Sequence, residues 1–347
     1  MIDKILRDYD RTHTLNARDI HYILEHAEEA SEPLFEKARE VSDRHFHKKI
    51  FVRGLIEFSN YCRNNCFYCG IRHDNAEVER YRLSTESMEA AVKSGVAMGF
   101  KTFVLQGGED PDFSDDLLAD WVRRIKRIDD EAAVTLSVGE RPKSVYAMWK
   151  EAGADRFLLR HETFDEAHYG KLHPRAMDRT RRIRCLEDLK DLGYQVGSGF
   201  MVGSPYQTTE NLVEDFLFLK RLQPAMVGIG PYVSHHATPF KDFPNGSVEL
   251  TAVCIAILRL LFPKANIPST TAMQTLAKDG RNRGILAGAN VFMPNLSPSA
   301  VRRRYALYDH KAAFALEAAE NLEELKDQIA SLGYEIVMNR GDYTDKE

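Results

Sequence analysis

The sequence predicts an α/β protein built as a (β/α)8 barrel of the TIM type, with a helical extension at its N-terminus. Short β-branched or apolar runs recur along the chain, and amphipathic stretches typical of helices separate them. There are eight such runs, which is the number of strands in a closed barrel of this type. A doubly wound open sheet is the alternative prediction, because a sequence does not show whether its sheet closes.

The start of the chain differs from the rest. The first 47 residues carry helical periodicity and many charges, and they contain no strand-like run. We therefore expect a helical extension over residues 1–47, and a barrel with a C-terminal helical segment over residues 48–347. The length of 347 residues allows two small domains or one barrel with additions, and no low-complexity linker divides the chain.

The repeating strands and helices can be assigned in order. The predicted strands are 50–58, 102–106, 133–138, 156–160, 195–202, 226–230, 266–271 and 289–294. The predicted helices between them are 84–98, 115–127, 143–152, 178–192, 208–222, 248–262 and 273–286. Several of these helices have Ser, Thr or Asp at the position of an N-cap.

Polar, glycine-rich or acidic segments follow the predicted strands. Examples are GGEDP at 107–111, GERP at 139–142 and HET at 161–163. Because the carboxyl ends of barrel strands meet at one end of the barrel, we expect these segments to surround one cavity. The histidines at strand ends, His161, His235 and His236, are expected to be hydrogen-bonded structural residues.

Charge and composition limit the classes of function. A net charge of −5 provides no broad basic surface, so nucleic-acid binding is not expected. No apolar run approaches the roughly 18 residues that cross a membrane, and the N-terminus lacks the apolar segment of a signal peptide. We expect a cytoplasmic protein. Three of its five cysteines lie within eight residues, which suits a metal site in a reducing compartment better than disulfides.

The segment CRNNCFYC places Cys62, Cys66 and Cys69 in the loop after the first strand. A cluster of four irons normally takes four cysteines, so three thiolates leave one iron with an open position where chemistry can occur. The remaining cysteines, Cys185 and Cys254, lie in helical patterns and are expected to be small buried hydrophobes.

Two other interpretations of the cysteine segment are less favoured. A structural zinc site completed by His73 or Asp74 would need a second pair of ligands across a longer loop, and the sequence has none. A small electron carrier would have four cysteines, and it would not need polar residues at eight strand ends. We therefore expect an enzyme with one iron–sulfur cluster.

The three cysteines, with the aromatic Tyr68 before the last of them, resemble the Cys-x3-Cys-x-aromatic-Cys signature of radical S-adenosylmethionine (SAM) enzymes. The resemblance implies a [4Fe-4S] cluster whose fourth iron is chelated by SAM. One electron from the reduced cluster then cleaves SAM to methionine and a 5′-deoxyadenosyl radical, while the protein provides positioning and excludes water.

A second segment, QGGED after the second strand, is similar to the Gly-Gly-Glu segment that meets the SAM amino group in that family. It supplies Gln106, Gly108 and Glu109 as expected SAM contacts. These residue types suit such a contact, because glycines let the backbone approach a ligand and a carboxylate accepts hydrogen bonds from an ammonium group.

Longer strings narrow the resemblance to one branch of the family. IEFSNYCRNNCFYCGIRHDN, VLQGGEDP, TLSVGERP, ADRFLLRHET, MVGSPYQT and GANVFMPNLSP look like the radical SAM maturases that help to build the active site of [FeFe]-hydrogenase. This resemblance implies a small organometallic substrate, an iron–cysteine precursor carrying CO and CN. It also implies a reductant such as ferredoxin or flavodoxin, and transient contact with other hydrogenase maturases.

The same resemblance assigns further residues. Those expected to contact SAM are Ser137, Glu162 and Arg182, with the neighbouring Arg181 as an alternative to Arg182. Those expected to line the substrate pocket are Thr135, Arg160, Thr270, Thr271 and Tyr305. Side chains two residues apart in a strand point to the same face. Thr135 and Ser137 are therefore expected to face the same way, and so are Arg160 and Glu162. A structural ion pair inside the barrel is the alternative for Arg160 and Glu162.

Enzymes of the same branch differ in their number of clusters and in their substrates, which gives alternative predictions for this chain. Some of these maturases carry three more cysteines near the C-terminus for an auxiliary cluster, but no cysteine follows Cys254 here, so none is expected. The tail 310–335 has the pattern of a plain helix. Biotin synthase needs a second cluster as a sulfur donor, which the strand ends do not offer. Methylornithine synthase, an amino-acid mutase with a single cluster, is the stronger rival.

Overall fold

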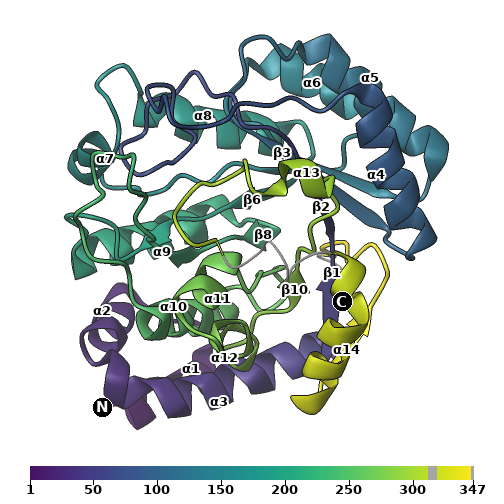
Figure 1. Ribbon diagram of the computed structural model, residues 1–347. Helices are drawn as coiled ribbons and strands as arrows, with labels where there is room; N and C mark the ends of the chain where they lie inside the picture. Colours follow the sequence, from purple (N-terminus) through teal and green to yellow (C-terminus); the bar gives the residue numbers. More distant parts are fainter. Residues whose placement is uncertain (312–318, 345–347) are drawn as a thin grey trace.

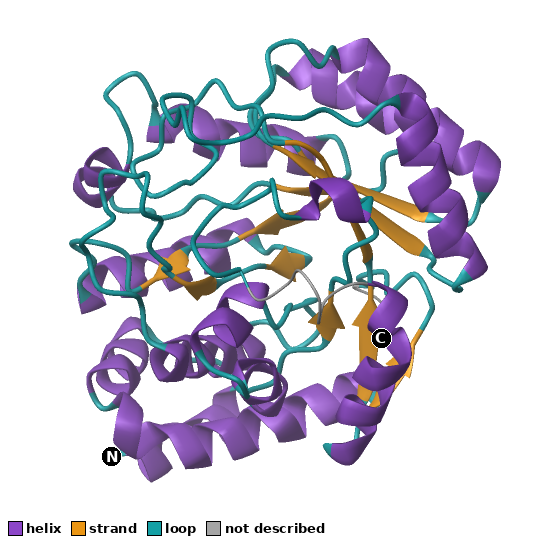
Figure 2. Ribbon diagram, viewed as in Figure 1, coloured by secondary structure: helices purple, strands orange, loops and turns teal. Residues whose placement is uncertain are grey.

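The computed structural model describes residues 1–311 and 319–344 of this chain. Parallel strands form its centre, and Figure 2 shows helices packed around them. The strands are β1 (Lys49–Val52), β2 (Gly54–Ser59), β3 (Thr102–Gly107), β4 (Ala133–Ser137), β5 (Arg156–Leu158), β6 (Gln195–Ser198), β7 (Met201–Val202), β8 (Met226–Val227), β9 (Gly230–Pro231) and β10 (Val291–Phe292). The main sheet has the order β2-β3-β4-β5-β6-β8, and all of its pairs are parallel.

The sheet closes into a barrel through short parallel bridges. Met226 pairs with Asn266, Pro268 pairs with Val291, and Leu55 pairs with Asn295. These bridges continue the parallel pairing from β8 through residues 266–268 to β10, which pairs with β1. The predicted (β/α)8 barrel is therefore confirmed, and the open sheet is wrong.

Helices cover the outside of the barrel in the predicted order. They are α4 (Thr85–Ala97), α5 (Asp115–Ile128), α6 (Lys143–Glu151), α7 (Glu166–Leu172), α8 (Arg179–Asp191), α9 (Thr209–Leu222), α10 (Val248–Leu261), α11 (Thr271–Leu276), α12 (Gly280–Leu286) and α13 (Ser299–Arg302). Figure 1 shows α4, α5, α6 and α8 following one another around the strands. Side chains of Ser84, Ser114 and Ser247 accept hydrogen bonds from the first turns of α4, α5 and α10, which is why these helices begin where they do.

Some predicted elements differ from the structure. The single helix expected at 273–286 is wrong, because the chain leaves the helical conformation at Ala277 and starts a second helix at Gly280. Gly280 lies against α11, where a Cβ atom would stand 2.0 Å from the carbonyl oxygen of Met273. The short α7 was not predicted.

The C-terminal tail also corrects the prediction of a plain helix over 310–335. Its described part contains a 3-10 turn (Ala319–Asn321), α14 (Leu322–Ser331) and β11 (Glu335–Val337). β11 pairs in parallel with β1, so the tail adds a strand beside the first barrel strand. The part of this prediction that falls on 312–318 lies outside the described residues.

The N-terminal residues form α1 (Ile2–Thr12), α2 (Ala17–Glu25) and α3 (Ala27–Phe46). α3 packs on α10, and its buried residues Ala30, Leu34 and Ala38 are spaced four apart, which places them on one face of the helix. Figure 1 shows these purple helices beside α10 and α12. The division into an extension at 1–47 and a barrel at 48–347 stays a prediction, because the extension shares one hydrophobic core with the barrel.

Residues of the tail close the amino-terminal end of the barrel. The fully buried Arg156, at the start of β5, donates to Asp342 Oδ1 at 2.7 Å and to the carbonyl oxygen of Arg340 at 2.6 Å. Asn266 donates to the carbonyl oxygen of Gly341 at 3.0 Å. The carboxyl ends of the strands are therefore the end at which a ligand can enter.

Asp342→Asn is expected to lower the free energy of unfolding by about 1–3 kcal/mol at pH 7, because Arg156 loses its ionic partner. Burial alone would raise the pKa of Asp342, but hydrogen bonds from Arg340 and Arg156 outweigh it and lower the pKa. The stabilisation is therefore complete above the ordinary carboxyl pKa of about 4, and it is lost as the pH falls below that value.

Denaturant unfolding at several pH values between 7 and 3 checks this prediction. The matched control is Asp120→Asn, which removes an exposed ion pair with Arg124 and should cost less than about 1 kcal/mol. Equal losses in the two variants would show that the contact of Asp342 with Arg156 does not stabilise the barrel.

Candidate active site

The three cysteines lie in the loop that leaves β2 at the open end of the barrel. Each side chain is partly buried and makes no disulfide. Burial raises the pKa of the Cys66 thiol to about 12, and it also raises the pKa values of Cys62 and Cys69. Without a metal these groups are protonated, so a metal that binds them must displace their protons.

The spacing of the thiols does not suit a single metal ion. Among the described residues, the only group whose three ligand atoms lie within 4.8 Å of one another is His235, His236 and Asp309. Sulfur atoms bound to one tetrahedral zinc would be about 3.8 Å apart. The thiols are therefore not gathered around one such ion, and the alternative zinc ligands His73 and Asp74 are exposed and paired with each other.

The glycines after β3 let the cysteine loop approach the strand end. A Cβ atom on Gly108 would lie 2.1 Å from the carbonyl oxygen of Tyr61 and 2.8 Å from the Cβ atom of Cys62. Any side chain at this position would push the loop away from the barrel mouth. Gly108 thus has a clear steric role in placing the cysteines.

Gly108→Ala is expected to destabilise the protein by about 1–3 kcal/mol through overpacking and to lower the iron bound per chain, because the cysteine loop must move. Gly170→Ala is the matched control, since a Cβ atom at Gly170 meets nothing within 4 Å. Iron analysis after anaerobic purification checks both variants. A Gly108→Ala protein with the iron content of the control would contradict the steric argument.

Glu109 joins two strand ends through its carboxylate. Its Oε2 atom accepts from Arg63 at 2.9 Å, and its Oε1 atom accepts from the backbone N–H of Glu140 at 3.0 Å. Arg63 lies between the first two cysteines, and Glu140 follows β4. The residue therefore ties the cysteine loop to the next strand end, in addition to any contact with a ligand amino group.

Arg182 and Arg181, which the sequence did not distinguish, differ in their surroundings. Arg182 is buried and donates to Glu140 Oε1 at 2.8 Å and to the carbonyl oxygen of Arg160 at 3.0 Å. Arg181 is 56% exposed, and its Nε atom lies 3.4 Å from Glu140 Oε2. Only Arg182 is buried with the strand ends, where its charge lowers the pKa of Cys66 against the effect of burial.

Arg160 and Glu162 follow β5, and their charged groups face each other at 3.1 Å. Glu162 has a φ of 66°, a left-handed conformation that is uncommon for a residue other than glycine. Backbone bonds to Gly199 and from Met201 hold it there. Strained residues of this kind cluster at functional sites, so the turn is a candidate for ligand contact.

Several of the predicted site residues carry buried polar atoms without a hydrogen-bond partner. These atoms are Thr135 Oγ1, Arg160 Nε and Thr270 Oγ1, while Arg160 Nη2 and Glu162 Oε2 have only each other, as an ion pair at 3.1 Å. Leaving such an atom buried and unbonded costs about 1–3 kcal/mol, and more for a charged group. The residues present thus fit a polar or charged ligand that would satisfy them.

The remaining predicted residues lie as follows. Gln106 and Ser137 are neighbours in the register between β3 and β4. Tyr305 is buried, and the side chain of Gln106 lowers the pKa of its hydroxyl slightly against the larger effect of burial. Thr271 begins α11, directly after Thr270. The structure thus joins Gln106, Ser137 and Tyr305 around the ends of the first strands.

Three residues near the cysteines were missed by the sequence reasoning. The hydroxyl of Tyr68 lies 3.1 Å from His173 Nε2, and Cys66 Sγ lies 3.8 Å from Met177 Sδ. Glu140, which holds both arginines, was noted only as part of the GERP segment. His173 and Met177 follow the unpredicted α7, so only that helix could have pointed to them.

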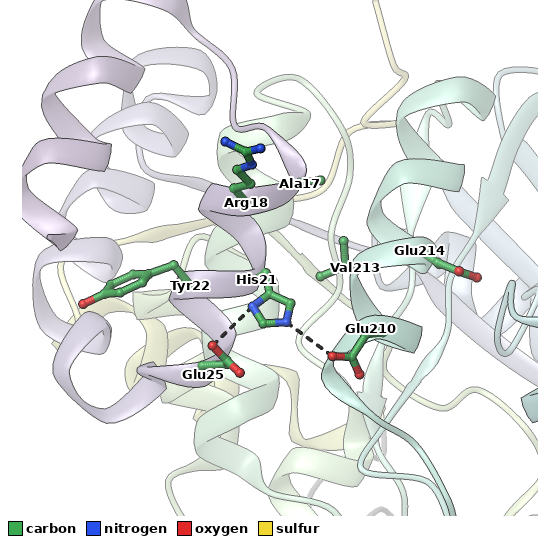
Figure 3. Close-up of a pocket in the computed structure, with 8 residues that line it drawn as sticks. All are labelled: Ala17, Arg18, His21, Tyr22, Glu25, Glu210, Val213 and Glu214. Carbon is green, nitrogen blue, oxygen red and sulfur yellow. Dashed lines mark hydrogen bonds and ion pairs between the residues drawn. The ribbon is translucent and has the colours of Figure 1, made fainter.

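A groove of 480 Å³ lies elsewhere, between α2 and α9. Figure 3 shows His21 in this groove between Glu25 and Glu210, with nitrogen–oxygen distances of 3.3 and 3.4 Å. None of the predicted site residues lines it. None of the described helices is both long enough and apolar enough to span a bilayer.

Comparison with known proteins gives a consistent result. The Radical SAM superfamily matches residues 56–219. The chain is 46% identical over 281 residues to the [FeFe] hydrogenase maturase subunit HydE of Thermotoga maritima, covering 81% of this chain and 80% of the relative. It is 30% identical over 289 residues to the 3-methylornithine synthase of Methanosarcina acetivorans, covering 82% and 80%.

Solved structures show the same fold. The crystal structure of methylornithine synthase superposes with a TM-score of 0.84 at 26% identity, covering 97% of both chains. The hydrogenase maturase HydG from Carboxydothermus hydrogenoformans superposes with a TM-score of 0.79 at 20% identity, covering 97% of this chain and 79% of that one. At that identity the second likeness shows the fold alone.

Proposed function

Since this chain belongs to the radical SAM enzymes and is HydE-like, we propose that it acts on a small iron–cysteine precursor with CO and CN ligands, in assembly of the [FeFe]-hydrogenase active site. The family implies an iron–sulfur cluster and SAM, a small-molecule substrate and an electron donor. The proposal adds the cluster ligands, the SAM contacts, the substrate and the partners.

Cys62, Cys66 and Cys69 are proposed as the ligands of a single [4Fe-4S] cluster whose fourth iron stays open to SAM. The open position is supported by the burial of the remaining two cysteines, Cys185 and Cys254, in helices α8 and α10. No auxiliary cluster is proposed. When bound, the reduced cluster supplies the electron that cleaves SAM to methionine and a 5′-deoxyadenosyl radical.

The chain's own residues bind and orient SAM. Arg182 has the planar fork that pairs with a carboxylate, and it is already oriented by Glu140 and by the carbonyl oxygen of Arg160. The other proposed SAM contacts are Tyr68, Gln106, Gly108, Glu109, Ser137 and Glu162. Glu109 and Glu162 are carboxylates suited to the SAM amino group and to its ribose hydroxyls.

The proposed substrate contacts are Thr135, Arg160, Thr270, Thr271 and Tyr305. One observation supports a polar or anionic substrate. Thr135, Arg160 and Thr270 each have a buried polar atom without a hydrogen-bond partner, and such a substrate would provide one. A ferredoxin or flavodoxin is proposed as the reductant, with transient contact to other hydrogenase maturases. We also propose that the protein is cytoplasmic and that it binds neither nucleic acid nor a membrane.

An amino-acid mutase of the methylornithine synthase type is the second candidate, favoured by the superposition over 97% of both chains. The same unbonded hydroxyl and guanidinium groups could hold the charges of an amino acid. The two candidates differ in substrate, and both use the same radical chemistry.

Deletion of the gene in its host, followed by a hydrogenase assay, tests the proposal. We expect [FeFe]-hydrogenase activity to be lost, and to return with the wild-type gene but not with a Cys62→Ser gene. Normal hydrogenase activity in the deletion strain would overturn the maturase function. Conversion of lysine to methylornithine by the purified protein would instead support the mutase.

A further inference from the structure

A second polar cluster lies at the barrel mouth, outside the proposed SAM and substrate contacts. It joins three segments: Glu77 beyond the cysteine loop, His235 and His236 after β9, and Asp309 near the C-terminus. Gly70, next to Cys69, packs on His235, and a Cβ atom there would lie 2.6 Å from His235 Nε2. The cluster therefore adjoins the cysteine loop.

The charge of this cluster is not balanced by basic side chains. Asp309 and Glu77 are carboxylates, and within the described ranges neither has a lysine or arginine at ion-pair distance. The groups that face them are the two histidines, which are neutral unless protonated. A cation bound here would balance the carboxylates.

The geometry suits a divalent transition metal. His235 Nε2 and Asp309 Oδ1 are 3.7 Å apart, which is too far for a hydrogen bond. Two atoms bound to one tetrahedral zinc lie about 3.3–3.6 Å apart. The side chain of His235 is only 5% exposed, and its Nε2 atom has no hydrogen-bond partner within the described part of the chain.

Glu77 provides a support typical of metal sites. Its Oε2 atom lies 3.1 Å from His236 Nε2, while His236 Nδ1 lies 2.7 Å from Asp309 Oδ1. A ligating histidine usually donates its other N–H to a carboxylate, which fixes the nitrogen that binds the metal. His236 Nδ1 would then face the metal, but it is hydrogen-bonded to Asp309 Oδ1 at 2.7 Å, closer than two ligands of one ion lie, so this bond has to open before both atoms can bind.

We propose that His235, His236 and Asp309 form a binding site for one divalent transition-metal ion, such as zinc, which links the barrel-mouth loop after β9 to the C-terminal segment beside the cysteine loop. Two imidazoles and one carboxylate favour zinc, cobalt or nickel over magnesium or calcium. Water completes the coordination.

Binding has an identifiable cost. The backbone N–H of Ala237 donates to His235 Nδ1 at 3.1 Å, which places the imidazole proton on Nε2. Ligation through Nε2 moves that proton to Nδ1, so the contact with Ala237 has to open. The site is therefore weaker than a preformed three-histidine centre, because the contact of His235 with Ala237 and the hydrogen bond between His236 and Asp309 both have to open.

Zinc binding by the protein with its cluster reconstituted under anaerobic conditions tests the proposal. Equilibrium dialysis should find about one zinc ion per chain, and zinc should raise the melting temperature. His236→Ala and Asp309→Asn should each weaken zinc binding at least tenfold with the iron content unchanged. His236 is 62% exposed, so the first variant should fold.

His21→Ala is the matched control, because His21 also lies between two carboxylates, but the ligand atoms of these three residues do not all lie within 4.8 Å of one another. This variant should keep the zinc. The proposal is overturned if the wild-type protein binds no zinc, or if both site variants bind as much as the control.

A further variant tests whether the zinc binds to the cysteines of the loop instead of the proposed site. In a variant with Cys62, Cys66 and Cys69 all replaced by serine, zinc cannot bind to thiols of the loop, and the proposed site should still take one ion. High-spin cobalt in the same variant should then show only nitrogen and oxygen ligation. Sulfur ligation, or loss of binding in this variant, would overturn the proposal without bearing on the radical chemistry.

Discussion

Cys66→Ser is expected to abolish formation of 5′-deoxyadenosine and to reduce the iron bound per chain to near background. The reason is that a thiolate is removed from a set of three, and the loop offers no other sulfur ligand. The measurement is iron analysis after anaerobic reconstitution, followed by product detection on reduction in the presence of SAM.

Cys185→Ser is the control for this experiment. Cys185 is buried in α8, where its thiol contacts the carbonyl oxygen of Arg141, so the variant should keep its iron and its activity. If Cys66→Ser retained the iron content of Cys185→Ser, the assignment of the cluster to the loop would be wrong.

Arg182→Gln is expected to raise the KM for SAM by about 10- to 100-fold with a smaller change in kcat, because a charge-assisted pair with the SAM carboxylate is lost. In this variant the carboxylate of Glu140 loses Arg182 but still has Arg181 at 3.4 Å as an ionic partner. The free energy of unfolding should therefore fall by only about 1–3 kcal/mol. Arg182→Lys should recover part of the affinity, since it restores the charge but not the planar fork.

Arg181→Gln is the matched control, one residue away and 56% exposed. Its KM for SAM should stay within about twofold of the wild-type value, because a change at an exposed position has little effect. Steady-state formation of 5′-deoxyadenosine at varied SAM concentration measures both variants. Equal KM values for Arg182→Gln and the wild-type protein would remove Arg182 from the SAM site.

Most of the barrel was predictable because its strands are short, apolar and separated by capped helices. Each of the eight predicted runs contains a strand or a bridge of the barrel. Alternation along a strand predicted that Arg160 and Glu162 face the same way, but both lie beyond the end of β5 and Glu162 is left-handed, so their ion pair at 3.1 Å depends on the turn that follows the strand. The family resemblance added the proposed ligand contacts of the site, but not the partners of these residues within the protein.

Other features depended on contacts that local patterns do not encode. The break between α11 and α12 follows from close packing at Gly280, and β11 forms only because β1 has a free edge beside it. Glu109 was assigned to a ligand amino group, yet its carboxylate binds Arg63 and the backbone of Glu140.

By itself the sequence determined the barrel, the three-cysteine loop and the chemistry that three thiolates allow, because each depends on the order and spacing of neighbouring residues. Only the tertiary structure decided that the barrel closes, that Arg182 rather than Arg181 is buried beside Cys66, and that Asp309 meets His236. The last two residues are 73 positions apart, and contacts over such separations are set by how the strands and loops pack.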